Sequence, residues 1–88
     1  MDNKQEESKE KESIIIVNTR EKVWGGKEIT YQEVVELAFG SYTDDPLVVY
    51  TITYSRGHGD KPEGSLVKGA SVKVKKGMIF NVTKTDKS

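Results

Sequence analysis

The sequence predicts an α+β domain in which one α-helix packs on a mixed sheet of four to five strands. Three observations support this fold class. A β-branched run lies at 14–17, a segment with a helix-capping signal spans 30–40, and a long alternating run occupies 47–55. With a short strand-like run before the helix and two more after 55, the expected order is β-β-α-β-β-β.

The composition limits the size and the chemistry of the protein. The chain has 88 residues, no cysteine and one histidine, enough for one small domain. Without cysteine, disulfide scaffolds, thiol nucleophiles and thiolate metal sites are excluded, which fits a reducing compartment. No apolar stretch approaches the roughly 20 residues of a membrane span, and the polar N-terminus does not read as a secretory signal. We therefore expect a cytoplasmic protein without membrane contact.

The charges are unevenly distributed although the formal net charge is zero. Residues 64–88 contain six lysines and a single acidic residue, whereas the segments before them are net acidic. A basic segment of this kind can bind nucleic acid. It lacks the arginines and interleaved aromatic residues that phosphate contacts and base stacking favour. We therefore expect a solvated lysine face and no nucleic-acid partner.

The chain divides into three parts. Residues 1–12 contain no apolar residue after the initiating methionine, so burial cannot offset the entropy of ordering them. We predict a disordered charged leader at 1–12, a folded domain at 13–83 and a flexible polar tail at 84–88.

The first strand pair opens the folded part. Residues 14–17 are all isoleucine or valine, and because both faces of this run are apolar we expect a central strand covered on both sides. Residues 18–21 read as a tight turn, and 22–24 return as the second strand, which a Gly-Gly pair either ends or bulges.

The helix has the clearest local signal in the chain. Thr30 is a good N-cap, Glu33 completes a capping box, and Gly40 stands where a left-handed residue ends a helix. Apolar residues at helical spacing fill the segment between them. The sequence therefore predicts a helix over 31–39.

Three further strands follow a loop at 41–46. They are expected at 47–55, 71–74 and 78–83, with a mobile glycine-rich connection at 56–65. Alternation along 47–55 leaves two assignments of its faces, and we favour Tyr50 and Ile52 pointing inward. The outward residues are then candidates for a partner-binding surface: Val49, Thr51 and Lys73.

Several pieces of this sequence resemble the bacterial ubiquitin-like family called the multiubiquitin domain. The resemblance covers about residues 14–88 and depends on the order and spacing of short motifs more than on any one of them. These motifs are Ile15-x-Val17-Asn18, Lys27-Glu28-Ile29-Thr30, the run Val34 to Gly40, the run Gly77 to Val82, and the ending Asp86-Lys87-Ser88.

The resemblance implies a β-grasp fold and a function as a protein modifier. It implies partners of four kinds, namely an E1-like activating enzyme, an E2-like conjugating enzyme, a JAB-type peptidase and target proteins, in a bacterial pathway of defence against phage. It also makes Asp86, Lys87 and Ser88 the conjugation terminus. One departure stands out, because ubiquitin and the sulfur carriers end in diglycine, whereas here the last two residues are Lys87-Ser88.

Two other classes of function compete with the modifier. A β-grasp module that binds partners through its sheet face without covalent attachment fits the same residues. A small enzyme lacks support, because His58 stands alone between two glycines, and no cysteine or glycine-rich phosphate loop accompanies it. We therefore expect no catalytic residue, no metal and no cofactor, and a solvated His58.

Overall fold

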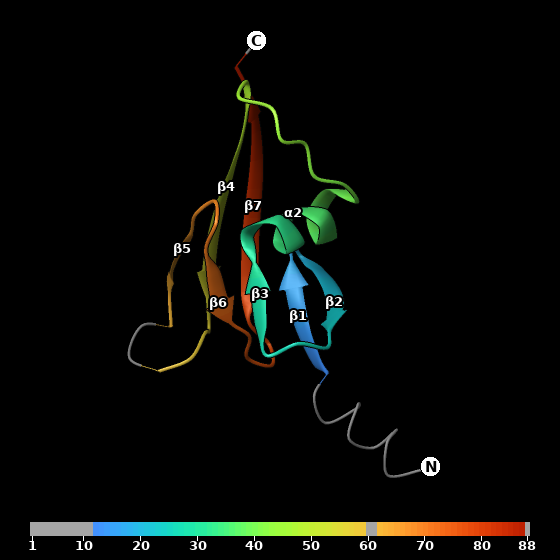
Figure 1. Ribbon diagram of the computed structural model, residues 1–88. Helices are drawn as coiled ribbons and strands as arrows, with labels where there is room; N and C mark the ends of the chain where they lie inside the picture. The colour runs from blue at the N-terminus through green and yellow to red at the C-terminus, as the bar shows by residue number, and fades with distance from the viewer. Residues whose placement is uncertain (1–11, 60–61, 88) are drawn as a thin grey trace.

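The computed structural model of the protein describes residues 12–59 and 62–87. It contains one helix and seven strands within these ranges (Figure 1). In chain order they are β1 (Ser13–Val17), β2 (Arg20–Trp24), β3 (Glu28–Thr30), α2 (Tyr31–Phe39), β4 (Val48–Ser55), β5 (Gly64–Leu66), β6 (Ser71–Lys73) and β7 (Ile79–Asp86).

Five of the strands form one mixed sheet in the order β2-β1-β7-β4-β5. Strands β1 and β7 are parallel, and the other pairs in this sheet are antiparallel. Helix α2 lies against one face of the sheet, beside a separate antiparallel ribbon of β3 and β6 (Figure 1). The predicted fold class is therefore confirmed, and the arrangement is that of a β-grasp domain.

The core lies between the sheet on one side and the helix with the β3–β6 ribbon on the other. Alternate residues of β1, β4 and β7 point into it, as the two-residue period of a strand requires. The helix contributes apolar side chains at helical spacing to this core, and β3 contributes one isoleucine. The side chains with less than 2% exposure are Phe80, Ile15, Ile29, Ile52, Met78, Val17, Val34 and Val35.

The helix begins and ends as the sequence predicts. The Thr30 hydroxyl accepts the Glu33 amide at 3.2 Å, and the Glu33 carboxylate accepts the Thr30 amide at 2.9 Å, so both halves of the capping box are present. At the other end Gly40 adopts a φ of 83° and donates its N–H to the Glu36 carbonyl at 2.8 Å.

Replacing Thr30 with alanine should lower the free energy of unfolding by about 1 kcal/mol, because the cap would no longer accept an otherwise unpaired helix amide. Urea denaturation followed by circular dichroism measures this difference. Thr43→Ala is the control, because this exposed threonine lies in the loop after the helix and its replacement should change stability by less than about 0.5 kcal/mol. Equal losses in the two variants would contradict a role of the cap.

Three parts of the sheet differ from the prediction. Strands β3 and β5 fall in segments expected to be irregular, and β6 pairs with β3 outside the main sheet. Each of these strands has only three residues. A strand this short shows almost no alternation, so its existence is decided by the neighbour with which it can pair.

The first strand is also less buried than predicted. Ile15 and Val17 are in the core, but Ile14 is 45% exposed and Ile16 is partly buried. The prediction of a strand covered on both sides is wrong, because the single helix and the β3–β6 ribbon cover only one face of the sheet. Of the predicted leader at 1–12, residues 1–11 lie outside the described part of the chain.

Candidate functional site

The end of β7 is the first candidate site, because it contains the residues predicted as the conjugation terminus. Strand β7 pairs with β4 in an unbroken antiparallel ladder that ends where Asp86 lies opposite Val48. Beyond it the Lys87 N–H donates to the Leu47 carbonyl at 2.7 Å. Ser88 lies outside the described residues. The two strands form a ribbon that rises past the rest of the sheet to a tip (Figure 1).

The predicted flexible tail at 84–88 is therefore wrong for residues 84–87. Residues 84–86 are strand, and Lys87 is hydrogen-bonded to Leu47, the residue before β4. The prediction treated these residues as a tail because of their polarity. An antiparallel ladder, however, is held by main-chain groups and needs only a partner strand, which residues 47–50 provide.

The base of this ribbon is fixed by aromatic side chains. Tyr42 stacks on Tyr50 with ring centroids 5.6 Å apart, and the Tyr31 hydroxyl donates to the Tyr50 carbonyl at 3.1 Å. The Tyr50 hydroxyl in turn accepts the Thr43 amide at 3.2 Å. Burial raises the pKa of the Tyr31 hydroxyl, which therefore stays protonated and a donor at neutral pH. These contacts hold the loop after α2 against β4, and β4 holds β7.

The second candidate site is the face of the sheet that points away from the helix. Val49 and Thr51 lie on this face, because Tyr50 and Ile52 between them are only 6% and 1% exposed. The favoured face assignment of this strand is therefore confirmed. Hereafter we call this side of the five-stranded sheet the outer face.

Lys73 does not belong to the outer face. It lies on β6 opposite Glu28 of β3, and the neighbouring pair, Val72 and Ile29, points toward the core. Because the β3–β6 ribbon covers the core on the helix side, Lys73 points to solvent on the side of the molecule opposite Val49. The structure thus separates Lys73 from the other two predicted partner-binding residues.

An apolar part of the outer face was missed in the sequence. Ile14 and Val23 are cross-strand partners on β1 and β2, and they are 45% and 59% exposed. Ile16 and Ile79, neighbours on β1 and β7, are partly buried beside them. The sequence contained a signal for this surface. The first strand is apolar on both faces, and a single helix can cover only one face of a sheet, so some of its apolar side chains had to be exposed.

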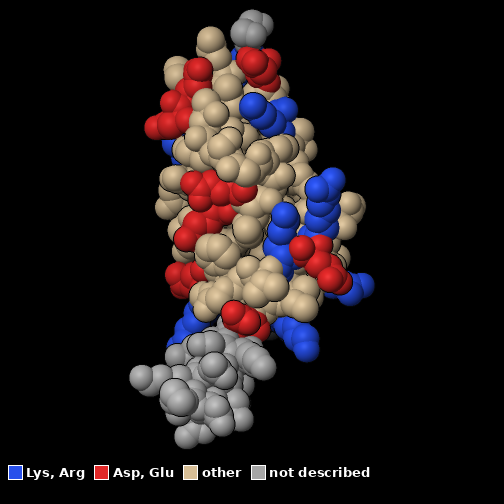
Figure 2. Space-filling model, turned by 90° about the vertical axis from the view of Figure 1, so that its right-hand side faces the viewer, with Lys and Arg blue, Asp and Glu red and all other residues tan. Residues whose placement is uncertain are grey.

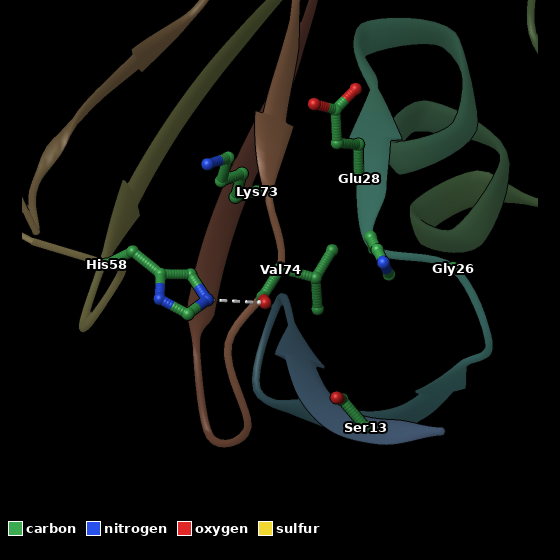
Figure 3. A pocket seen from close by; sticks show the side chains of 7 residues that line it. Ser13, Gly26, Glu28, His58, Lys73 and Val74 are labelled. Carbon is green, nitrogen blue, oxygen red and sulfur yellow. Dashed lines mark hydrogen bonds between the residues drawn. The ribbon is translucent and has the colours of Figure 1, made fainter. Parts of the chain in front are cut away.

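A shallow hollow lies between the start of β1, the β3–β6 ribbon and the loop after β4 (Figure 3). In it His58 donates from Nε2 to the Val74 carbonyl at 2.8 Å, since a carbonyl oxygen can only accept. His58 is exposed, as predicted, but it also ties its loop to the end of β6. Glu28 and Lys73 line the same hollow, so the charges in it are of both signs.

The charged side chains do not form one large surface patch of a single sign. Figure 2 shows both signs on the face that it presents. Of the six lysines of 64–88, Lys73 lies on β6, Lys84 lies on β7 and the other four lie outside the strands. Asp44, at 2.9 Å, raises the pKa of one of these four, Lys68. Within residues 12–59 and 62–87 no three His, Asp or Glu side chains gather closely enough to hold a metal ion. In the same ranges, no helix is long and apolar enough to cross a membrane.

Comparison with known proteins places the chain in a family. A family model described as multiubiquitin matches residues 14–86, from the second residue of β1 to the last residue of β7. No curated protein and no solved structure matches the chain. Because the family match covers most of the chain and every strand of the β-grasp sheet, the protein belongs to the multiubiquitin family and is a ubiquitin-like domain.

Proposed function

We propose that this protein is a ubiquitin-like modifier that is attached to target proteins through the carboxyl group of Ser88. In this proposal an E1-like enzyme activates that carboxyl with ATP, an E2-like enzyme receives it, and a JAB-type peptidase removes the modifier from its targets. The setting that the family resemblance suggests is the cytoplasm of a bacterium, in a pathway of defence against phage.

One structural observation supports the proposal most. Val82 is the last buried residue of β7, and residues 83–87 are all exposed on a strand that leads to the tip of the ribbon. A partner enzyme can therefore reach the end of the strand without disturbing the core. No side chain of the domain is needed for the chemistry, which the enzymes supply.

The pairing of β7 with β4 sets a condition on activation. To enter a narrow enzyme site, the last residues must separate from Leu47 and from Val48, the first residue of β4. Each net hydrogen bond is worth about 0.5–1.5 kcal/mol. Freeing the last two or three residues thus costs a few kcal/mol at most, an amount that binding to an enzyme can supply. Since Lys87-Ser88 replaces diglycine, we also expect an activating site wider than that for ubiquitin.

Deleting residues 86–88 should abolish conjugation and leave the domain folded, because the Asp86 and Lys87 side chains are exposed and add nothing to the core. The protein is expressed with its cognate enzymes and ATP, and mass spectrometry detects an isopeptide or ester remnant on target proteins. The circular dichroism and melting temperature of the deleted variant should stay within a few degrees of those of the parent.

Replacement of Asp86 and Lys87 by alanine is the control, since it keeps the length of the chain and the terminal carboxyl group. This variant should still form conjugates. A deletion variant that conjugates as well as the parent would contradict the modifier proposal.

A second candidate function is a module that binds partners non-covalently through the outer face. The observation in its favour is that this face carries the exposed pair Ile14 and Val23 and has no described element over it. Replacing Val49 and Thr51 with arginine should then weaken partner capture while deletion of residues 86–88 leaves it intact. If deletion of residues 86–88 abolished partner capture and the arginine replacements left it intact, the modifier would be favoured.

A further inference from the structure

Strand β2 forms one edge of the five-stranded sheet. It pairs with β1 on one side, and among the described strands none lies beyond it on the other side (Figure 1). A sheet edge of this kind presents main-chain groups with which another strand can pair.

The hydrogen bonds of β1 show which main-chain groups of β2 face this free side. The Ile14 carbonyl and the Ile16 N–H both bond to the two residues that precede β7. Because the direction alternates along a strand, the residue between them bonds toward β2, where its partner is Lys22. The main-chain groups of Lys22 therefore face β1, and those of its neighbours Glu21 and Val23 face the free side.

The side chains at this edge differ between the two faces of the sheet. Val23 and its cross-strand partner Ile14 are exposed on the outer face. Lys22 and Trp24 lie on the opposite face and are partly buried. The Trp24 Nε1–H donates to the Glu28 carbonyl at 2.9 Å, which holds the indole ring in place beside the edge.

We propose that a second copy of this protein pairs its own β2 with this edge in antiparallel register, so that the two Val23 residues lie opposite each other. Each Val23 would donate its N–H to the carbonyl of the other. The two sheets would continue into one, and on the outer face Ile14 and Val23 of each copy would form one apolar row across four strands.

The side chains of β2 select this register. Centring the pair on Arg20, Glu21 or Lys22 would place two like charges directly opposite each other, which is unfavourable. Centring it on Trp24 would move half of the pairing past the end of the strand.

The register centred on Val23 avoids both problems. It places Lys22 of each copy opposite Trp24 of the other, where an ammonium group can lie against an aromatic ring. Only a second copy of β2 supplies both a valine opposite Val23 and a tryptophan opposite Lys22. This reciprocal match favours a second copy over an unrelated strand.

The interface would be small, because it contains little more than β2 of each copy. Interfaces well below about 1,000 Å² are typical of weak and transient association. We therefore expect a dimer that forms at high protein concentration and dissociates on dilution. Strand β1 separates β2 from β7, so the pairing leaves the end of β7 accessible and does not rest on the modifier proposal.

A single introduced cysteine tests the register, since the chain has none of its own. In the proposed pair the Cα atoms of the two Val23 residues are about 5.5 Å apart, within the range that a disulfide spans. Val23→Cys should form a disulfide-linked dimer under mild oxidation at least about tenfold faster than Glu21→Cys.

Glu21 is the matched position for this comparison. It is exposed on the same face of the same strand and also directs its main-chain groups to the free side. In the proposed register, however, it lies opposite Gly25 of the second copy. The two Glu21 residues are then four positions apart along the pair, more than about 13 Å.

Proline at the same position provides the second arm of the experiment. The Val23 N–H does not bond within the domain, and proline is tolerated on edge strands, so Val23→Pro should keep the circular dichroism of the parent. It removes both central hydrogen bonds of the pair and should raise the dissociation constant of the dimer about tenfold or more. Val23→Ile keeps the N–H and should dimerise at least as strongly as the parent. Analytical ultracentrifugation over a range of concentrations measures all three proteins.

Equal cross-linking rates for Val23→Cys and Glu21→Cys would overturn the proposal. So would a folded Val23→Pro variant that dimerises like the parent, or a parent protein that stays monomeric at millimolar concentration.

Discussion

Replacing Phe80 with alanine should cost about 3–5 kcal/mol of the free energy of unfolding. Phe80 is fully buried on the inner face of β7 and lies 6.2 Å from the Tyr54 ring, between centroids. Its removal would leave a cavity where the sheet meets the helix. A domain of 88 residues has only about 4–13 kcal/mol of stability, so a large part of it would be lost.

Urea denaturation followed by circular dichroism measures this loss. The matched control is Asn81→Ala, since Asn81 is the next residue of the same strand and is exposed on the outer face. It should change stability by less than about 0.5 kcal/mol. If the two variants unfolded at the same urea concentration, the inner and outer faces of β7 would be wrongly assigned.

The elements with a strong local signal were predictable from the sequence. The helix was found with both ends because its capping box and terminal glycine act within a few residues of the chain. Eight residues of regular alternation in β4 place Tyr50 and Ile52 on the same face, which we favoured as the inner one and which the structure buries. In both cases the residues that decide the structure are neighbours in the sequence.

The candidate sites depended on contacts between distant segments, and there the sequence was less informative. The pairing of residues 84–86 requires β4, more than thirty residues earlier. The position of Lys73 depended on whether β6 joined the main sheet or β3, which three residues cannot determine. The exposure of Ile14 depended on how many elements were available to cover the sheet.

The turn between β1 and β2 also shows a long-range role that the sequence does not reveal. Val17 and Arg20 pair directly, so the turn has two residues, Asn18 and Thr19, with φ angles of 51° and 70°. Positive φ at both positions is typical of a type I′ turn, which favours asparagine followed by glycine. Asn18 suits its position. Thr19 does not, because a β-branched residue is strained there.

Replacing Asn18 with alanine should therefore cost about 2–3 kcal/mol. Part of this loss comes from the left-handed backbone, which alanine adopts less readily than asparagine. The larger part comes from Val82, whose N–H and carbonyl would lose the side-chain amide at a partly buried position. Asn18→Gly separates the two causes, since it keeps the backbone conformation and removes only the amide.

Thr19→Gly should act in the opposite direction and raise the free energy of unfolding by up to about 1 kcal/mol, because it relieves the strain at a positive φ. Urea denaturation of the three turn variants measures both effects, and amide hydrogen exchange at Val82 reports the loss of the Asn18 contact directly. If Asn18→Gly were as stable as the parent and Val82 exchanged no faster, the side-chain amide would contribute nothing. The stability of β7 beyond Phe80 would then depend on β4 alone.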